Sequence, residues 1–221
     1  MFEMEIDELR KFPGLVDYMN RSRRIKPARY GNIYRLILKN ECRKLVEIGV
    51  FNAGNAKHMI DTAKIGNGYV HYIGFDLFED LTEADLDDEF SKFPLTMDEA
   101  AELLANSGAK VDLVKGNTIN TLPASLDMIA APDFVFIDGG HSHKTIESDW
   151  HNIQQVMTNR TIVLFDDYYL AGSRQLEGMG CNKLIDSLDR EKYNVTFLHP
   201  ADTFEKDWGP LGIQMVVVTH A

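Results

Sequence analysis

The chain has 221 residues and contains 23 Lys or Arg against 34 Asp or Glu, which gives a formal net charge of −11 at pH 7. We do not expect so negative a chain to bind nucleic acid or an anionic membrane in general, because their phosphate groups repel it. Its length suits one large domain or a domain with a small cap. No apolar run approaches the ~20 residues that a membrane-spanning helix needs.

Cysteine usage and the first residues favour a cytoplasmic protein. The chain has only Cys42 and Cys181, too few for the disulfide framework of a small secreted protein. Residues 1–7 are acidic and lack the basic and apolar regions of a signal peptide. We therefore expect a cytoplasmic protein without a membrane anchor.

Residues 1–40 are expected to form a helical N-terminal cap. The pattern indicates two helical pieces within residues 3–40, broken near Pro27. The second piece, residues 28–39, places apolar side chains at helical spacing: Tyr30, Ile33, Tyr34 and Ile37.

A basic cluster lies where the two helical pieces meet. Five basic residues fall within nine positions: Arg21, Arg23, Arg24, Lys26 and Arg29. A solvated linker or helix face explains such a run, since isolated charge clusters usually face water. The other interpretation is contact with an anionic substrate group or a partner subunit, and the sequence leaves both open.

From residue 44 onward, short apolar runs alternate with helical segments, which is typical of a doubly wound α/β sheet. We expect residues 41–221 to form one such domain. The expected strands are 44–48, 69–76, 111–114, 134–138, 161–165, 193–198 and 213–219. The expected helices are 53–63, 97–105, 118–129, 143–156 and 181–189. The last two strands are separated only by a loop, which predicts an antiparallel hairpin at the sheet edge.

Two segments interrupt this alternation. Residues 77–92 carry seven carboxylates between Glu79 and Glu89 and do not resemble a strand. Residues 168–182 are rich in Gly and Tyr and are expected to form a loop. We expect both segments to control substrate entry, as mobile segments above such sites commonly do.

The most informative feature is a pair of apolar strands that each end in acid. Residues 134–137 run into Asp138, with His141 three positions later, and residues 161–165 run into Asp166 and Asp167. The carboxyl ends of parallel strands meet at one edge of a sheet, so these side chains are expected to gather there. Carboxylate oxygens suit a hard divalent cation, and a histidine beside them suits a general base.

Each of these residues also has a plainer explanation. Asp138 could cap a helix or contact only a cofactor, and Asp166 and Asp167 could form a helix cap with a solvent-facing neighbour. A lone histidine is usually structural, and His143 is expected at a helix start rather than among ligands. Among the aromatic residues, Trp150 is expected in the core. Tyr168, Tyr169 and Trp208 are expected in loops, where they either shape a substrate pocket or are simply exposed.

The turn after the first expected strand has the character of a ligand-binding loop. Gly49 and Gly54 let the backbone approach a ligand closely, and the following helix start offers free N–H groups. Glu47 precedes them and would repel a pyrophosphate, but it suits a cationic ligand. Asp76, at the end of the second strand, can accept hydrogen bonds from two ribose hydroxyls. Gly116 and Asn117, after the third strand, are placed to flank an adenine.

These motifs resemble those of a known family. Residues 46–55 (VEIGVFNAGN), 136–142 (FIDGGHS) and 164–168 (LFDDY) look like the motifs of class I S-adenosylmethionine-dependent methyltransferases. More narrowly, they resemble the metal-dependent O-methyltransferases grouped with macrocin O-methyltransferase and the cephalosporin-biosynthesis methyltransferases. The resemblance covers roughly residues 40–190, and its last two motifs are the more specific ones.

The resemblance implies a Rossmann-like, seven-stranded sheet of order 3-2-1-4-5-7-6 with an antiparallel last strand. It assigns the metal, Mg²⁺ or a similar divalent cation, to Asp138, Asp166 and Asp167, and catalysis to His141 and Asp138. S-adenosylmethionine would contact Glu47, Gly49, Val50, Phe51, Asn52, Gly54, Asp76, Leu77, Gly116, Asn117, Thr118 and Asp138.

The chain departs from the family pattern at two positions. His143 stands where the family often has an aromatic residue, and Ala53 stands where it has a glycine. The first departure leaves the surroundings of the site open. The second is mild, because alanine still permits a helix start.

We therefore expect transfer of a methyl group to a hydroxyl of a small polyhydroxylated acceptor, such as a sugar or natural product, assisted by Mg²⁺. A metal-dependent hydrolase that uses His143 together with the Asp138, His141, Asp166 and Asp167 cluster is one alternative. A non-catalytic protein that binds S-adenosylmethionine is another. The sequence leaves the acceptor and the oligomeric state open, including a homo-oligomer.

Overall fold

The computed structural model describes residues 27–66, 68–89, 91–170 and 176–221. The first helical piece expected in residues 3–40 and most of the basic cluster lie outside the described residues. Arg29 is the member of that cluster that the structure describes.

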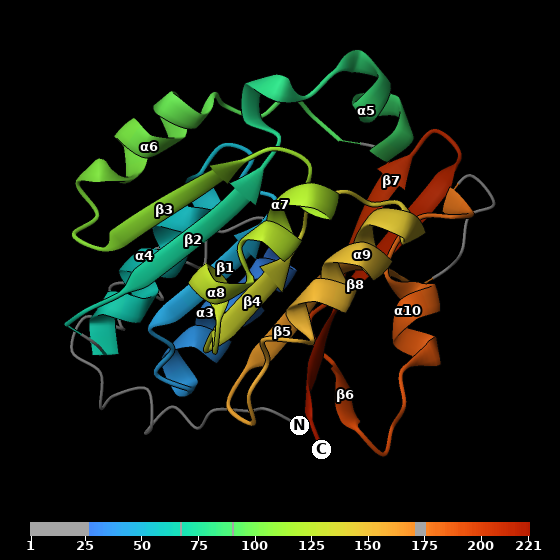
Figure 1. The fold of residues 1–221 in the computed structure, drawn as a ribbon. Coiled ribbons are helices and arrows are strands. Elements are labelled where there is room, and N and C mark those ends of the chain that lie inside the picture. The colour runs from blue at the N-terminus through green and yellow to red at the C-terminus, as the bar shows by residue number, and fades with distance from the viewer. Residues whose placement is uncertain (1–26, 67, 90, 171–175) are drawn as a thin grey trace.

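One mixed β-sheet forms the centre of the molecule (Figure 1). Its strands lie in the order β3-β2-β1-β4-β5-β8-β6, and β7 pairs with β8 off this path. The first five strands are parallel, whereas β8 runs antiparallel to both β5 and β6. The strands are β1 (Lys44–Ile48), β2 (His71–Asp76), β3 (Lys110–Lys115), β4 (Phe134–Ile137), β5 (Ile162–Tyr169), β6 (Tyr193–Phe197), β7 (Asp202–Lys206) and β8 (Gly209–His220).

The expected Rossmann-like sheet order is confirmed, with β8 as its seventh strand. The expectation that only a loop separates the two final strands was wrong. Residues 202–206 form β7, which pairs with the first half of β8 from Gly209 to Ile213. β8 is therefore a long strand that carries β6 along its second half and β7 along its first.

Helices cover both faces of this sheet (Figure 1). One face packs on α3 (Gly31–Lys39), α4 (Gly54–Gly66) and α6 (Met97–Ala105). The other face packs on α7 (Thr118–Ala124), α8 (Leu126–Ile129), α9 (His143–Ile153) and α10 (Asn182–Ser187). The remaining elements are η1 (Ala28–Tyr30), η2 (Phe78–Asp80) and α5 (Glu83–Glu89).

Alternation along the buried strands divides the core into these two layers. Phe134 and Phe136 of β4 join the cluster beneath α3 and α4, while Val135 and Ile137 join the cluster beneath α9. Successive side chains of a strand point to opposite faces, so a continuous apolar run serves both layers. No helix among the described residues is both long enough and apolar enough to cross a membrane.

Some boundaries differ from those expected. The acidic segment forms η2 and α5, and the single helix expected over residues 118–129 is divided at Ser125 into α7 and α8. β5 continues past Phe165 to Tyr169, so Tyr168 and Tyr169 belong to a strand rather than to a loop. The extension is possible because β8 is long enough to pair with both halves of β5.

Candidate functional site

The loop between β4 and α9 carries the first two candidate side chains. β4 ends at Ile137, and the backbone N–H of Asp138 still donates to the carbonyl of Ile48 on β1, at 2.9 Å. α9 begins after Ser142, whose side chain accepts from the backbone N–H of Thr145 and so caps the helix. This sharp change from strand to helix holds Asp138 and His141 at the carboxyl edge of the sheet.

Asp166 and Asp167 lie at an irregularity in β5. The register between β5 and β8 shifts between Phe165 and Tyr168, as at a β-bulge. Asp167 has a φ of 58°, a left-handed conformation that is uncommon for a residue other than glycine. Because a bulge re-aims the side chains within it, the two consecutive carboxylates take different partners.

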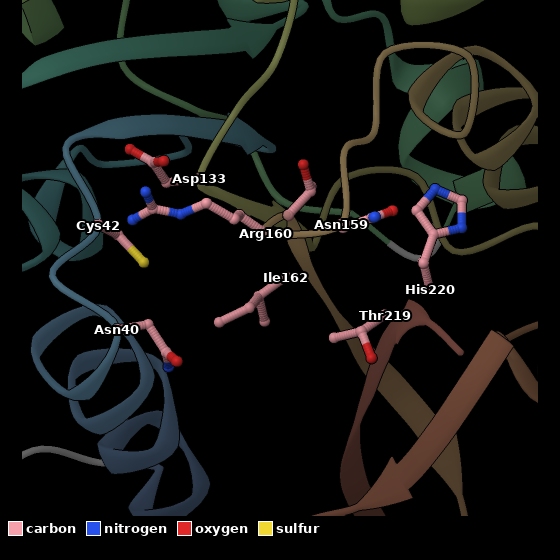
Figure 2. Close-up of a pocket in the computed structure, with 9 residues that line it drawn as sticks. Asn40, Cys42, Asp133, Asn159, Arg160, Ile162, Thr219 and His220 are labelled. Atoms are coloured by element: carbon pink, nitrogen blue, oxygen red, sulfur yellow. The ribbon is translucent and has the colours of Figure 1, made fainter.

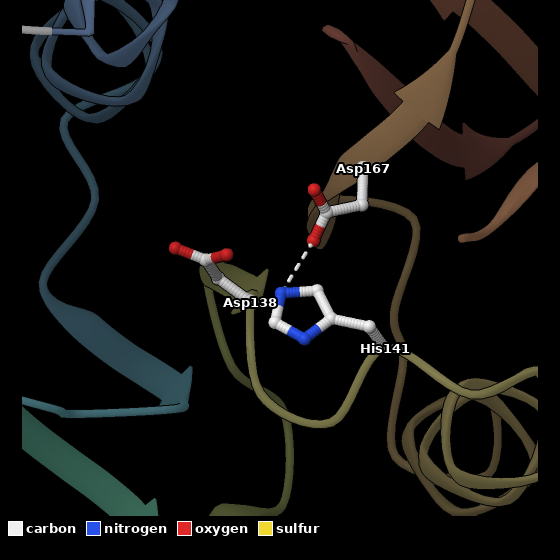
Figure 3. Close-up of side chains that lie close together, drawn as sticks. All are labelled: Asp138, His141 and Asp167. Carbon is white, nitrogen blue, oxygen red and sulfur yellow. Dashed lines mark ion pairs between the residues drawn. The ribbon is translucent and has the colours of Figure 1, made fainter. Parts of the chain in front are cut away.

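Asp138, His141 and Asp167 converge (Figure 3). Each offers one potential ligand atom, and these atoms all lie within 4.8 Å of one another. Nε2 of His141 lies 3.0 Å from Oδ2 of Asp167. Nδ1 of His141 lies 2.5 Å from the backbone carbonyl oxygen of Glu89, which can only accept, so Nδ1 carries a proton.

The charges around His141 determine its protonation. Burial acts to lower the pKa of His141, but the charge of Asp167 and the hydrogen bond to it outweigh burial and raise that pKa to about 10. Burial acts to raise the pKa of Asp167, and the charge of His141 outweighs it, so the pKa of Asp167 lies below its usual value. At neutral pH, the two side chains therefore form an ion pair in this structure.

Asp166 takes a different partner from its neighbour. Nε and an Nη atom of Arg29 donate to its two carboxylate oxygens at 2.7 and 2.6 Å. The backbone N–H groups of Ala28 and Arg29 donate to Asp202 at the start of β7, at 3.0 and 2.8 Å. η1 is thus fastened both to the bulge of β5 and to β7, two segments far from it in the sequence.

Tyr30, the next residue of η1, contacts the third carboxylate. Its hydroxyl donates to Oδ2 of Asp138 at 2.5 Å. Burial, followed by the charges of Asp166 and Asp167, raises the pKa of Asp138 well above its usual value. A phenol donor at this position adds to the charge of His141 in stabilising a carboxylate that lies beside Asp166 and Asp167.

The glycine loop after β1 lies directly beside this cluster. Gly49 has a φ of 95°, and a Cβ atom built on it would lie 2.1 Å from the backbone oxygen of Asp138. The backbone N–H groups of Val50 and Phe51 both donate to Oδ2 of Asp76, at 2.8 Å each. Oδ1 of Asp76 accepts from the N–H of Phe78 at 3.0 Å. Of the roughly four acceptor positions of a carboxylate, about one remains for a ligand hydroxyl.

Glu47 lies beneath this loop rather than in it. It is 1% exposed, and its oxygens accept from the hydroxyl of Tyr72 and, at 2.5 Å, from Nδ2 of Asn55. The hydroxyl of Tyr34 donates to the other end of the Asn55 amide at 2.7 Å. Burial raises the pKa of Glu47 to about 7. In this structure Glu47 organises a buried polar network under α4.

The other predicted cofactor residues line the same edge of the sheet. Gly116, with a φ of 126°, follows β3, and its N–H donates to the carbonyl of Asp76 at 2.9 Å. Asn117 caps α7, which begins at Thr118. Oδ1 of Asn52 accepts from the N–H of Gly54 at 3.0 Å, at the start of α4. Leu77 directly follows Asp76 and is half-buried.

Three further expectations concern the surroundings of the cluster. His143 begins α9, as expected, and its Nδ1 lies 2.9 Å from the carbonyl oxygen of Gly180, so it does not belong to the converging set. The hydrolase interpretation thereby loses one of its ligands. Trp150 is 5% exposed and packs against Phe165 in the core, as predicted.

A cavity of about 360 Å³ lies elsewhere (Figure 2). Most of its lining residues lie just before β1, β4 and β5 or at the start of β5, and the others lie at the end of β8. The cavity therefore opens at the amino ends of the parallel strands. They are Asn40, Cys42, Asp133, Asn159, Arg160, Thr161, Ile162, Thr219 and His220. We place the functional site at the opposite edge, because the converging acids, the histidine and the glycine loop all lie there.

A Rossmann-like sheet with a glycine loop, an acid after β2 and an Asp–His cluster after β4 and β5 is the arrangement of α/β proteins that bind nucleotide-type ligands. The chain belongs to the methyltransferase-domain family, whose model matches residues 46–168. The resemblance to class I methyltransferases is thereby confirmed, while the narrower grouping with macrocin O-methyltransferase stays a prediction. No curated protein sequence matches the chain.

Solved structures share the fold across nearly the whole chain. The O-methyltransferase TomG from Streptomyces achromogenes, in complex with SAM, is 15% identical with a TM-score of 0.59, covering 99% of this chain and 92% of that one. An O-methyltransferase from Bacillus cereus, in complex with SAH, is 14% identical with a TM-score of 0.58, covering 99% and 94%. An rRNA methylase from Streptococcus thermophilus is 12% identical with a TM-score of 0.56, covering 89% and 98%. Similarity at this level of identity shows a shared fold. A shared fold does not identify the molecule that accepts the methyl group.

The sequence motifs did not predict three participants at this site: Tyr30, Glu89 and the role of Arg29. Arg29 was singled out as part of a basic cluster with two possible roles, and Tyr30 only as an apolar position of a helix. Glu89 was one of seven acids in a segment. The only available signal was their residue type, because their partners lie 52 to 137 residues away.

Proposed function

We propose that the protein is an S-adenosylmethionine-dependent O-methyltransferase that acts on a hydroxyl group. The observation that carries the proposal is the convergence of Asp138, His141 and Asp167 beside the Gly49 loop, in a chain of the methyltransferase-domain family. Two solved structures of the same fold, with SAM and with SAH, support the choice of methyl donor.

The methyl donor would lie across the carboxyl ends of β1, β2 and β3. Asp76 would accept from a ribose hydroxyl, and Gly49 would let the methionine end approach the backbone closely. Glu47 is 1% exposed and would contact the donor only if it released its bonds to Tyr72 and Asn55. The proposed contacts are Glu47, Gly49, Val50, Phe51, Asn52, Gly54, Asp76, Leu77, Gly116, Asn117, Thr118 and Asp138.

In the reaction, the acceptor oxygen forms a bond to the methyl carbon while the bond from that carbon to the sulfonium sulfur breaks. S-adenosylhomocysteine leaves, and the hydroxyl proton passes to Nε2 of His141, which must first give up the proton that it shares with Asp167. The geometry supports this role, because Nδ1 of His141 stays bonded to the carbonyl of Glu89 while Nε2 faces Asp138 and Asp167. Asp167 would then hold the imidazolium that forms.

The residues also fit a divalent cation, in a set that differs from the expected one. The carboxylates of Asp138 and Asp167 converge and offer the oxygen atoms that Mg²⁺ prefers. Asp166, the third expected ligand, has both oxygens bonded to Arg29 and would join only if it released that partner. A divalent cation held there would lower the pKa of an acceptor hydroxyl and fix its position.

We propose a small polyhydroxylated acceptor, such as a sugar or natural product, rather than nucleic acid. The net charge of −11 disfavours binding to a phosphate backbone. Asp138 and Asp167, with Tyr30 donating to Asp138, offer polar groups that suit a diol rather than an apolar acceptor. We also propose a cytoplasmic location, because the chain has only two cysteines and so no disulfide framework of the kind that small secreted proteins use.

Titration calorimetry with S-adenosylhomocysteine, with and without Mg²⁺, tests the first part of this proposal. We expect micromolar binding that Asp76→Ala abolishes and that Asp61→Ala, an exposed acid on α4, leaves unchanged. Acceptor screening with labelled S-adenosylmethionine follows, with His141→Gln expected to bind the donor but not to turn over. Absence of binding under both conditions would rule out the methyltransferase proposal.

A further inference from the structure

The last residue of α5 reaches back onto the loop between β4 and α9. Oε2 of Glu89 accepts from the backbone N–H of Ser142 at 2.7 Å, and Oε1 accepts from the hydroxyls of Ser142 and Thr145 at 2.8 and 2.6 Å. Both oxygens of Glu89 are therefore occupied by residues more than 50 positions away in the sequence.

These bonds place a negative charge at the N-terminus of α9. The first turn of a helix leaves backbone N–H groups unsatisfied, and an anion there is stabilised by them and by the helix dipole. Ser142 caps α9, so Glu89 binds the capping residue itself. α5 is thus docked on the start of the helix that carries the site loop, above the carboxyl ends of the strands (Figure 1).

The loop is shaped to receive this carboxylate. A Cβ atom built on Gly140 would lie 2.8 Å from Oε2 of Glu89 and 2.7 Å from Cγ2 of Thr145. Gly140 does not have a positive φ, so close packing rather than backbone conformation requires glycine at this position.

Docking of the side chain also brings the main chain of Glu89 onto the base. Its carbonyl oxygen lies 2.5 Å from Nδ1 of His141. A carbonyl accepts only, so this bond keeps a proton on Nδ1 and directs Nε2 toward Asp138 and Asp167. A neutral His141 in any other tautomer would present an N–H where a base needs a lone pair.

Other acids of residues 77–89 serve different ends. Glu79 accepts from the N–H of Met97 at 2.9 Å and pairs with Lys115 at 2.8 Å, so it fastens α6 and β3. Asp85 bonds to Thr82, the residue just before α5. The contact with His141 therefore belongs to Glu89 and does not follow from the acidity of the segment as a whole.

We propose that Glu89 is a positioning residue that couples docking of α5 to the tautomer and orientation of His141. When α5 is docked, Nδ1 of His141 is held and the base is assembled; when α5 is undocked, the ring loses this partner. The inference rests on the proposed function, in which His141 takes the acceptor proton. It gives the acidic segment a defined task at the site.

Proton–nitrogen NMR of the labelled full chain tests the contact without any turnover. A hydrogen-bonded imidazole N–H gives a downfield, exchange-protected signal. Loss in His141→Gln assigns such signals to His141, and correlations of each ring nitrogen with the carbon-bound ring protons separate Nδ1–H from Nε2–H. We expect Glu89→Ala to abolish the Nδ1–H signal, Glu89→Gln to retain part of it, and Asp88→Ala, an exposed neighbour, to leave it unchanged. An unchanged signal in Glu89→Ala would overturn the proposal.

Kinetics separate positioning from general stability. With an accepted acceptor, kcat of Glu89→Ala should fall by about 10- to 100-fold, part of the effect of a general base, while KM for S-adenosylmethionine changes less than twofold. If Glu89→Ala does not fold, the pair Ser142→Ala and Thr145→Val removes the two hydroxyl bonds to Oε1 from the other side and leaves the bond from the Ser142 N–H to Oε2. Should no acceptor be turned over, loss of the NMR signal would still support the positioning role. The proposed function alone would then fail.

Discussion

Replacing Arg29 by methionine removes a buried cation while keeping most of the apolar stem. The Arg29 and Asp166 side chains are only 6% and 1% exposed, and two hydrogen bonds of 2.7 and 2.6 Å join them. Removing one partner of a buried ion pair leaves the other charge uncompensated, which costs about 3–5 kcal/mol. The backbone bonds from Ala28 and Arg29 to Asp202 do not depend on the side chain and should persist.

The expected result is a loss of about 3–5 kcal/mol in the free energy of unfolding at pH 7. At about 2–4 °C per kcal/mol for a chain of this size, the melting temperature should fall by roughly 6–20 °C. The loss should shrink at pH 5. Burial already raises the pKa of Asp166, and without Arg29 that pKa rises further, so protonation removes the buried charge as the pH falls.

A double-mutant cycle decides whether the pair is responsible. Adding Asp166→Asn to Arg29→Met should recover most of the lost stability, because no uncompensated charge remains. Arg35→Met, at an exposed position of α3, serves as the matched control and should be nearly neutral. Urea unfolding measures Arg29→Met, Asp166→Asn, the double variant and Arg35→Met. If Arg29→Met lowers the free energy of unfolding equally in the wild type and in Asp166→Asn, the ion pair is not responsible and the reasoning is refuted.

Three further outcomes are expected. Asp167 raises the folded-state pKa of His141 to about 10. Their pair therefore stabilises the fold fully below the unfolded pKa of about 6.5, and this contribution disappears as the pH rises through 10. In urea unfolding from pH 6 to pH 10, the free energy of unfolding of His141→Gln should decline less than that of the wild type. Gly49→Ala should cost about 3 kcal/mol or more, because its Cβ meets backbone, whereas Gly108→Ala meets only the flexible end of Lys64 and should cost less on thermal unfolding. Labelled methyl transfer should fall in EDTA and recover with Mg²⁺, and an unchanged rate in EDTA would exclude the metal.

The sheet and its acids could be predicted because their signals are local. Residues 134–138 and 161–167 each join a buried run to acid within a few positions, and parallel strands deliver such ends to one edge whatever the rest of the chain does. The confirmed strand order was implied by the resemblance of the motifs to a known family rather than by this alternation. β7 was missed because Asp202–Lys206 has three charged residues in five and becomes a strand only by pairing with β8.

The partners of those acids could not be predicted in the same way. Asp166 and Asp167 are adjacent and chemically identical in the sequence, yet one binds Arg29 and the other His141. The difference arises at the β-bulge, where Asp167 is left-handed and the regular alternation of side chains along β5 is interrupted. Tertiary packing of η1 against β5 and β7 supplies Arg29, and nothing within ten residues of Asp166 indicates it.

The charges of the site connect its two proposed parts, proton transfer and cation binding. In this structure His141 is held in its protonated form by Asp167, and an imidazolium cannot accept a proton. A positive charge brought next to Asp138 and Asp167 would offset their pull on the histidine proton and lower the pKa of His141 toward neutrality. Both the sulfonium of the methyl donor and a divalent cation carry such a charge. The base would therefore become active when its ligands are in place, and the rising limb of the rate against pH should move to lower pH as the Mg²⁺ concentration is increased.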